Sequence, residues 1–598
     1  ASIAASNTTI KSYGNIYSWA QGGTFSSGTG NNYMRGGGYG YVQGNSILEV
    51  GDSSTAPGGN TTGENGVSDG SRSSSNRTGV GGSGFVNVGY GTANGNTIAT
   101  SNLAYKSMTS GYQAINASDI VGGGGTEGSD NSYWQVGDST TIQNNDIARW
   151  TYGDCFGGYH QGNSYNFNNG GIQDTLEGAG YTGTLYGNSN TQMNNGQVDW
   201  FESGGSWNNR VIQGNMTNVI YNGVINAIAG GNYGSGGGNV TGGNSEVDVY
   251  GGDFSGNPRT GTKQLCGGNF YNASNTIRGN STLNLDLSGH TGNTFKFPTG
   301  NTYLSGGNGY GNTLTKVGSG SSNVITLSIK TGDATANTLA STILYGDGQS
   351  NGNSNTYTNV GTININIQNM SSTTPMSVGS VYGTNYTQAL QYNTNINISD
   401  GVNIKGSVNS GGTNDNYQTS VTTGKASVAA VNLGDNSSQL PINISGTLAN
   451  FTNAKISPNA TVNVSGSFLN GNGATAVNHA ASYNTTGNLI LGTSSTLAIT
   501  SSSSLISIAK MTVGSNITLS TPYVQTSGLI NLSDLDMSTN NGSLFWSPIG
   551  TATSPTNTFG GAYWGTQRGF PVFTFNGGDT ATKSGAVNIS PNNFSGVD

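Results

Sequence analysis

The chain has 598 residues, of which 100 are glycine, and charged residues make up only 8% of it. Average soluble domains carry roughly 25% charged residues, and disordered chains usually combine low hydrophobicity with high net charge. The net charge of −8 and the lack of any run of Lys or Arg argue against nucleic acid as a partner, because such binding depends on neutralising phosphates.

The composition favours strands over helices. Gly costs about 1 kcal/mol in a helix interior relative to Ala, and Asn, Ser and Thr prefer turns and caps. Strict alternation of apolar and polar residues is the commonest pattern, which is typical of strands. We therefore expect an all-β chain. No apolar run reaches the ~20 residues that span a bilayer, so we expect no membrane insertion.

Residues 1–229 contain many Gly-rich turns and little apolar alternation. One internal echo exists, in which Asn45–Ser53 resembles Asn131–Ser139. This part is predicted to consist either of solenoid coils with long loops or of a separate β module, and continuity with the following coils is the preferred interpretation. It is also the predicted ligand-binding region.

Aromatic residues are dense between residues 133 and 207. Sugars bind by stacking on aromatic rings while their hydroxyls pair with carboxylates and amides. The candidate glycan-binding residues are Trp134, Trp150, Tyr152, Tyr159, Trp200, Trp207, Asp138, Asp146, Asp199 and Glu202. The alternative is that these rings form the core of a region that is poor in aliphatic residues.

The two cysteines, Cys155 and Cys266, are in neither a CxxC pair nor a metal-binding spacing. They form either one disulfide or two buried thiols. The three histidines, His160, His290 and His479, are far apart in sequence, so we expect ordinary surface or loop residues and no catalytic site. Ca²⁺ bound by loop Asp and Asn residues is the one cofactor considered, although no EF-hand-like spacing supports it.

Residues 230–545 repeat one theme, a Gly-rich turn followed by an alternating strand. It occurs at 246–249, 283–287, 325–329, 363–367 and 396–398, and again at 442–446 and 462–466. The unequal spacing is typical of a β-solenoid whose strands stack regularly while its loops vary in length. Aliphatic side chains are predicted to stack inward, each contributing roughly 1.5–3 kcal/mol, and Asn, Thr and Ser to face outward.

Residues 546–598 break the Asn- and Thr-rich pattern. The aromatic residues near this boundary are Phe545, Trp546, Phe559, Tyr563, Trp564, Phe570, Phe573 and Phe575. A solenoid must cover the unpaired backbone of its last coil, so the segment is predicted to be an aromatic C-terminal cap. A glycan site is the alternative.

The stacked Asn-rich strands, the doubled turn at 442–466 and the segment Phe559–Trp564 carry a resemblance. The chain resembles the pectate-lyase-like adhesive domains of large cell-surface adhesins from lactic acid bacteria. The resemblance implies a right-handed parallel β-helix that attaches to host or plant glycans, mucus or neighbouring cells. Leu440–Ile444 does not match the LPxTG wall-sorting signal, so any wall attachment is expected outside this segment.

The sequence therefore predicts a non-catalytic, extracellular adhesin domain that binds glycans or glycoproteins at a cell surface. One alternative is a surface structural protein that self-associates in aggregates or biofilms. Another is a polysaccharide lyase or glycoside hydrolase. The local carboxylate pairs Glu246/Asp248 and Asp534/Asp536 have no Lys or Arg close in sequence, and we interpret them as outward-facing solvating groups.

Overall fold

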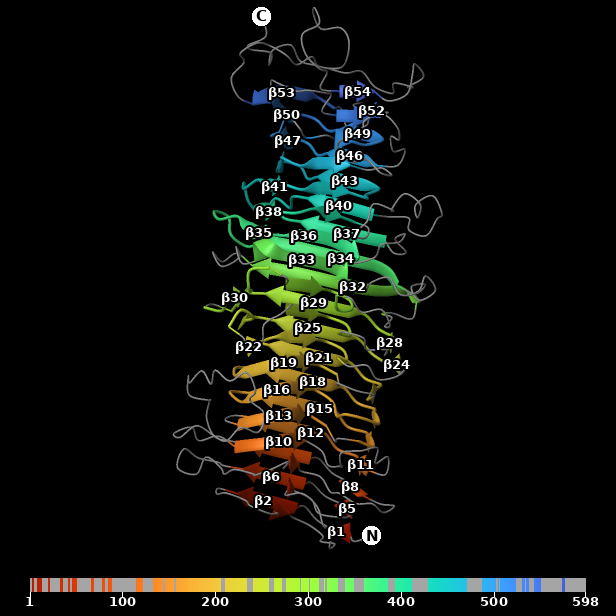
Figure 1. The fold of residues 1–598 in the computed structure, drawn as a ribbon. Helices are drawn as coiled ribbons and strands as arrows, with labels where there is room; N and C mark the ends of the chain where they lie inside the picture. The colour runs from red at the N-terminus through yellow and green to blue at the C-terminus, as the bar shows by residue number, and fades with distance from the viewer. Residues whose placement is uncertain are drawn as a thin grey trace, which may run out of the picture. The chain divides into compact units, whose positions relative to one another are not determined.

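The computed structural model describes strands between residues 3 and 121, most of residues 133–549, and strand β54 (Phe573–Phe575) (Figure 1). These residues contain strands and almost no helix, which confirms the all-β prediction. Within them, no helix has the length and apolar character needed to cross a membrane. The chain divides into two compact units, residues 1–326 and 327–598.

The first unit contains three parallel sheets, here called A, B and C. Sheet A consists of β1 (Ile3–Ala4), β5 (Tyr41–Val42), β8 (Thr78–Val80), β11 (Tyr133–Gln135), β14 (Tyr159–His160), β17 (Thr184–Leu185) and β20 (Val211–Ile212). Sheet B consists of β2 (Thr8–Ser12), β6 (Ser46–Val50), β9 (Gly84–Val88), β12 (Ser139–Gln143), β15 (Ser164–Asn168), β18 (Ser189–Met193), β21 (Met216–Ile220), β25 (Ser245–Val249) and β29 (Ser281–Asp286).

Sheet C contains the longest strands of the first unit before residue 230. It consists of β3 (Ala20–Gln21), β4 (Tyr33–Arg35), β7 (Gly66–Ser68), β10 (Ile115–Val121), β13 (Asp146–Tyr152), β16 (Ile172–Glu177), β19 (Gln197–Ser203), β22 (Val224–Ile225), β23 (Ala227–Ala229), β26 (Gly252–Asp253), β27 (Lys263–Cys266), β30 (Phe295–Lys296) and β31 (Thr302–Ser305). A further small sheet pairs β24 (Val240–Thr241) with β28 (Thr276–Ile277).

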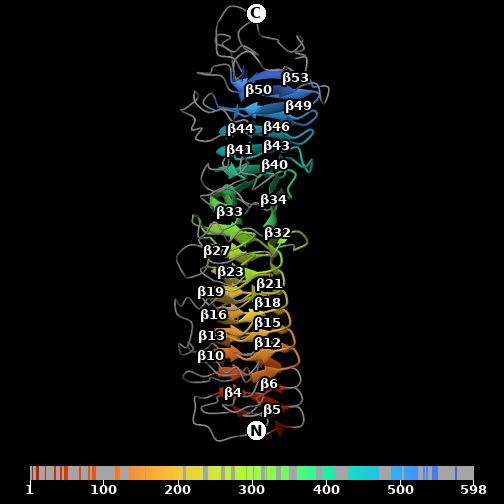
Figure 2. The same cartoon turned by 90° about the vertical axis from the view of Figure 1, so that its right-hand side faces the viewer.

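The chain visits the sheets in cyclic order, so each strand pairs in parallel with its equivalent one coil later. For example, Ser139 is in register with Ser164, and Ser164 with Ser189. Figure 2 shows the strands of sheet B from β6 to β21 in sequence order, one beside the next. This cyclic parallel stacking is compatible with a β-helix or solenoid.

The second unit repeats the same arrangement with three sheets, here called D, E and F. Sheet D contains β35 (Met376–Val378), β38 (Val402–Ile404), β41 (Ile442–Ile444), β44 (Thr461–Val464), β47 (Thr496–Ile499), β50 (Ile517–Pro522) and β53 (Leu544–Ile549). Sheet E contains β34 (Val360–Asn369), β37 (Asn393–Ile398), β40 (Ala429–Leu433), β43 (Asn453–Ile456), β46 (Asn488–Leu491), β49 (Lys510–Val513) and β52 (Asp534–Asp536). Sheet F contains β33 (Thr342–Asp347), β36 (Ser380–Thr384), β39 (Val408–Asn409), β42 (Thr447–Ala449), β45 (Ser467–Leu469), β48 (Ile506–Ser507), β51 (Ile530–Leu532) and β54.

The interior of the second unit is aliphatic. Ile365, Ile396 and Val431 are register partners on successive coils, and all three side chains are fully buried. On the outward face, Asn397 Nδ2 donates to Asn366 Oδ1 at 2.8 Å, and Asn432 continues the same ladder at 2.8 Å. The predicted inward aliphatic stacks and outward Asn ladders are therefore confirmed for these coils.

An asparagine ladder runs along the start of sheet B in the first unit. The backbone N–H of each rung donates to the side-chain Oδ1 of the rung one coil earlier, at 2.7 Å for the first bond and 2.9 Å for the others. The acceptors are Asp138, Asn163, Asn188, Asn215, Asn244 and Asn280, and the last donor is Val324. Apart from Asp138, the acceptors are uncharged amides, whereas like charges on neighbouring strands would repel one another.

The interior of the first unit is partly polar, and glycine makes this possible. Ser189 Oγ donates to Gly204 O, and Ser281 Oγ donates to Gly306 O at 2.7 Å. A Cβ atom on Gly178 would lie 2.5 Å from both Gly204 O and Ser189 Oγ. Only glycine fits there, which explains much of the glycine content between residues 150 and 310.

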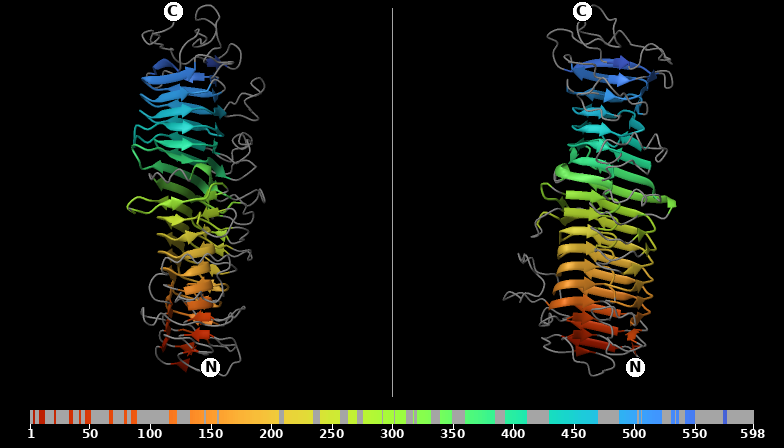
Figure 3. Two further views of the ribbon diagram at one scale, coloured as in Figure 1. Left: turned by 60° about the vertical axis from the view of Figure 1, so that its left-hand side comes forward. Right: turned by 45° about the vertical axis from the view of Figure 1, so that its right-hand side comes forward.

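The strand register of the first unit tests two of the sequence-based interpretations. Ser46 is in register with Gly84, and Gly84 with Ser139, so Ser46 corresponds structurally to Ser139. The alignment of Ser46 with Ser132 that the internal echo suggested is therefore wrong. Strands β21 and β25 pair in register across residue 230, so the stacking continues through the expected boundary at 229/230 (Figure 3). Apart from β53 and β54, the predicted cap at 546–598 lies outside the described residues.

We expect Ile396→Ala to lower the free energy of unfolding by about 2–5 kcal/mol, because it leaves a cavity in a closely packed column. Gln368→Ala, at an exposed position on the neighbouring strand, should change it by less than about 0.5 kcal/mol. Urea denaturation followed by circular dichroism measures both. Equal effects of the two variants would contradict the inward assignment of Ile396.

Candidate functional site

Three of the sequence-predicted ligand residues lie in the interior. Tyr152 and Asp199 are each 1% exposed, and Glu202 is fully buried. Gln197 Nε2 donates to Asp199 Oδ1 at 2.7 Å, so that carboxylate is engaged within the fold. A glycan in solvent cannot reach these side chains in this structure, so the prediction that they contact a ligand is corrected to an interior role.

The other candidates do not converge on one surface. Trp134 is 41% exposed and stacks on Tyr159 with ring centroids 4.9 Å apart. Trp150 is half-buried against Tyr152, and Trp200 packs at right angles on Phe201 and Tyr233. Asp138 is exposed and belongs to the asparagine ladder. Trp207 and the side chain of Asp146 lie outside the described residues.

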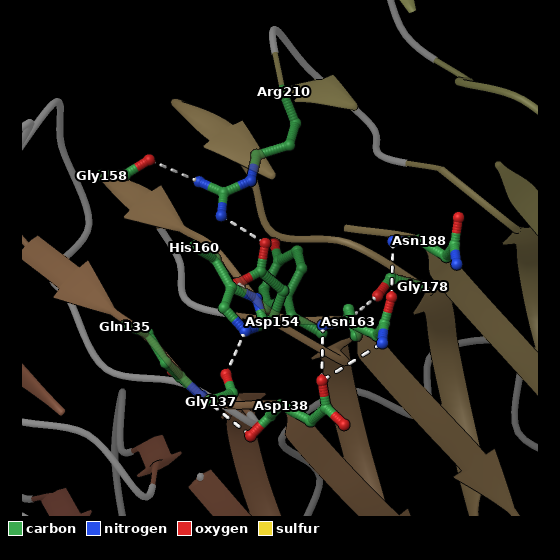
Figure 4. A network of polar contacts seen from close by, with 12 residues as sticks. Gln135, Gly137, Asp138, Asp154, Gly158, His160, Asn163, Gly178, Asn188 and Arg210 are labelled. Carbon is green, nitrogen blue, oxygen red and sulfur yellow. Dashed lines mark hydrogen bonds and ion pairs between the residues drawn. The ribbon is translucent and has the colours of Figure 1, made fainter. Parts of the chain in front are cut away.

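A buried ion network lies beside the predicted aromatic region (Figure 4). His160 Nδ1 lies 2.8 Å from Asp154 Oδ1, and His160 Nε2 lies 2.7 Å from Gly137 O. All the side chains of Asp154, His160 and Arg210 are fully buried. The prediction that His160 is an ordinary surface residue is therefore wrong, and both its ring nitrogens face protein acceptors.

Arg210 ties three coils together. Its guanidinium pairs with Asp154 Oδ2 and donates to the carbonyls of Thr182 and, at 3.0 Å, Gly158. Carbonyl and carboxylate acceptors surround the charged group, which is what a buried arginine requires. The network consequently stabilises the corner that leads into sheet A, and it leaves His160 no access to a substrate.

Glu202 is a different case, because neither of its carboxyl oxygens has a hydrogen-bond partner. Its register partners on either side, Leu176 and Ile228, are fully buried aliphatic residues. Burial therefore raises the pKa of the Glu202 carboxyl well above its ordinary value. A neutral carboxylic acid in an aliphatic column is a local weakness of the core.

A second cluster lies on the outward face of sheet B, where sequence analysis predicted only solvating carboxylates. In β25 the residues Ser245, Val247 and Val249 are buried, so Glu246 and Asp248 point outward. Ile220, Val249 and Leu285 are register partners, so the residues that follow them, Tyr221, Tyr250 and Asp286, occupy one outward column. The cluster, here called the acidic-aromatic patch, consists of Tyr221, Glu246, Asp248, Tyr250, Asn284, Asp286 and His290.

Three rings of the patch form a continuous stack. The ring centroids of Tyr221 and Tyr250 are 5.3 Å apart, and those of Tyr250 and His290 are 4.3 Å apart with an interplanar angle of 25°. All three side chains are partly exposed. Stacked rings with accessible faces offer a rigid apolar surface beside polar groups.

The loop after β29 holds His290 in this position. Asn293 Nδ2 donates to the carbonyls of Tyr221 and Tyr250, at 3.1 and 2.8 Å, which fastens the loop over the ends of β21 and β25. The loop reverses at Gly289 and Gly292, whose φ angles of +75° and +90° lie in the region that favours glycine. The position of His290 in the ring stack thus depends on the side-chain amide of Asn293, which bonds the backbone of both tyrosines.

The electrostatics of the patch are unusual for so weakly charged a chain. Burial raises the pKa of Glu246, and the nearby charge of Asp248 raises it further. Burial and then the charge of Asp286 raise the pKa of Asp248, against a hydrogen bond of 3.2 Å from Asn284 Nδ2. Burial and the surrounding carboxylates also raise the pKa of the Tyr250 phenol. Besides burial, Asp248 therefore disfavours the ionisation of Glu246, and Asp286 disfavours that of Asp248, on one small face.

Neither a metal centre nor a disulfide follows from the described part of the chain. No group of three or more His, Cys, Asp or Glu side chains among these residues is placed to hold a metal ion. Cys266 is buried, and its Sγ lies 3.6 Å from Gly268 O. Cys155 lies outside the described residues, so neither alternative, one disulfide or two buried thiols, is tested.

No protein-family model matches the chain, and no curated protein or solved structure is significantly similar to it. The resemblance to adhesive β-helix domains therefore rests on sequence features alone.

We expect Glu202→Leu to stabilise the protein by about 1–3 kcal/mol at neutral pH, because it removes a buried acid without partners. The folded-state pKa is raised above the unfolded value near 4.5, so ionisation favours the unfolded state as the pH rises above that value. The gain should consequently shrink in acid. Urea unfolding of wild type and variant across the range from about pH 4 to pH 7.5 measures it.

The matched control is Gln368→Leu, which places a leucine at an exposed position and removes no titratable group. Its unfolding should keep the wild-type pH dependence. A Glu202→Leu variant with an unchanged pH profile would contradict the assignment.

Proposed function

We propose that this chain is a right-handed parallel β-helix, exposed at a cell surface, that binds glycans through the acidic-aromatic patch without cleaving them. The observation that carries the proposal is the stack of Tyr221, Tyr250 and His290 beside the outward carboxylates of Glu246 and Asp248. Cyclic parallel pairing in both units supports the β-helix.

The patch matches the chemistry of a sugar. Pyranose rings present C–H groups that pack on aromatic faces, and their hydroxyls donate to carboxylates and accept from amides. Tyr250 and His290 supply the faces, while Asp248 and Asn284 supply an acceptor and a donor joined at 3.2 Å. Ligand hydroxyls that donate to Asp248 would also relieve the mutual repulsion of the carboxylates.

A surface location is consistent with the composition. Hydroxyls and amides cover much of the outward face, and the Asn ladders satisfy one another between coils. Such a surface stays hydrated with few charges. The resemblance to bacterial surface adhesins points to the same setting, with any attachment to a wall made by a region outside this segment.

A second candidate is glycoside hydrolysis at the same patch. Hydrolases need two carboxyl groups with different ionisation across the scissile bond, and the raised pKa values of Glu246 and Asp248 favour one protonated acid. Incubating the protein with each bound glycan and assaying new reducing ends separates cleavage from binding.

We expect Tyr250→Ala to weaken glycan binding roughly 5–30-fold, which corresponds to about 1–2 kcal/mol of lost ring contact. The measurement is a titration against ligands identified on an array of mucin, pectic and cell-wall glycans. Tyr186→Ala, at a 44% exposed tyrosine outside the patch, is the matched control and should bind normally. Equal loss in both variants would remove the patch as the binding site.

Binding should also weaken in mild acid. The pKa of Asp248 is raised, so its carboxylate is protonated, and lost as an acceptor, at a higher pH than that of an ordinary aspartate. Asp248→Asn should therefore lower the affinity at neutral pH and flatten the profile. Asp435→Asn, an exposed aspartate of the second unit, should leave the profile unchanged. Isothermal titration between about pH 4 and pH 7 checks this.

A further inference from the structure

A buried lysine meets an asparagine between two coils of sheet C. Lys263 is only 3% exposed, and its Nζ lies 2.6 Å from Asn226 Oδ1. The two residues are 37 positions apart in sequence. They are neighbours in the sheet, because Ala227 is in register with Gln264 and the residues that precede them are Asn226 and Lys263.

The asparagine side chain is held in a fixed orientation. Its Nδ2 donates to Trp200 O at 2.9 Å, so its carbonyl oxygen is turned toward the lysine. Ala227, which follows Asn226, and Cys266, which ends the strand that begins at Lys263, belong to an apolar cluster with Phe201, Ala229, Tyr233 and Phe270, against which Trp200 packs. The neutral amine is the form that attacks a carbonyl carbon.

A buried carboxyl group lies at an irregularity in β19, on the coil next to Asn226. The register changes from Val198↔Ile225 to Glu202↔Ile228, so the three residues 199–201 oppose the two residues 226 and 227. The extra residue makes a β-bulge, a feature that re-aims side chains. Asp199, which is 1% exposed, belongs to the bulged segment that opposes Asn226 and Ala227.

We propose that Lys263 and Asn226 form an intramolecular isopeptide cross-link. Lys263 Nζ attacks Asn226 Cγ, the new Cγ–Nζ amide bond forms, and the Cγ–Nδ2 bond breaks. Asp199 takes one proton from Nζ and passes it to the departing nitrogen, which leaves as ammonia. Nothing is oxidised or reduced, and no cofactor takes part. The bond would lock two coils of the first unit covalently, independently of any glycan binding.

The test uses the full chain and intact-mass spectrometry. The measured mass should be lower than that of the printed sequence by one ammonia molecule, and a digest should contain a branched peptide that joins residues 226 and 263. Linear peptides with unmodified Asn226 and Lys263 from the wild-type protein would overturn the proposal.

Three variants assign the chemistry. Lys263→Met should abolish the mass loss, and Asp199→Asn should abolish or slow it, while Lys296→Met, at an exposed lysine of the same unit, should retain it. A mass loss that persists in Lys263→Met would indicate a cyclic imide at an asparagine and would refute the cross-link. The wild-type digest decides the question even where a variant fails to fold.

Discussion

In-register parallel stacking is the constraint on which this structure depends. Each side chain has its equivalent about 4.8 Å away on the coil before and the coil after, so every position must tolerate a copy of itself. Asparagine and serine meet this condition, because each is donor and acceptor at once. A column of like charges does not, and this accounts for a chain that is rich in amides and poor in charges.

The two units satisfy this constraint with different interiors. In the second unit, columns such as Ile365–Ile396–Val431 exclude water by aliphatic burial. In the first unit, serine hydroxyls reach glycine carbonyls across the interior, and a Cβ at Gly178 would collide with both groups. Hydrogen bonds of this kind contribute only about 0.5–1.5 kcal/mol each to stability, but leaving a buried polar group unpaired costs more. These bonds therefore specify how the interior packs more than they stabilise the fold. Glu202, neither of whose carboxyl oxygens has a partner, is one departure from this rule.

Sequence reasoning predicted the fold where alternation is strong and failed where it is weak. The Ile- and Asn-rich strands of sheet E were identified because burial and spacing both follow a period of two. Continuity of the coils before residue 230 was the preferred interpretation, but their individual strands were not located, because their interior mixes Ser, Thr and Asn with apolar residues and this pattern does not distinguish inside from outside. The candidate site was missed because it, too, depends on strand register. Counting aromatics selected Tyr152 and Trp200, which pack inward or on other rings, whereas Tyr221 and Tyr250 become a site only when the register places them in one column.

The outward face of sheet B offers a direct comparison between charged and neutral positions. Asn163, Asn188 and Asn215 keep one column uncharged over successive coils, and Asp248 could be replaced by an amide without losing its place beside Asn284. Beyond the effect of burial, Asp248 raises the pKa of Glu246 and Asp286 raises the pKa of Asp248, although Asp248 accepts from Asn284 Nδ2 and Asp286 accepts from the backbone N–H of Ser288. Under the proposed function, a ligand whose hydroxyls donate to these acids would offset their repulsion, and the adjoining ring stack would favour a ligand with an apolar face.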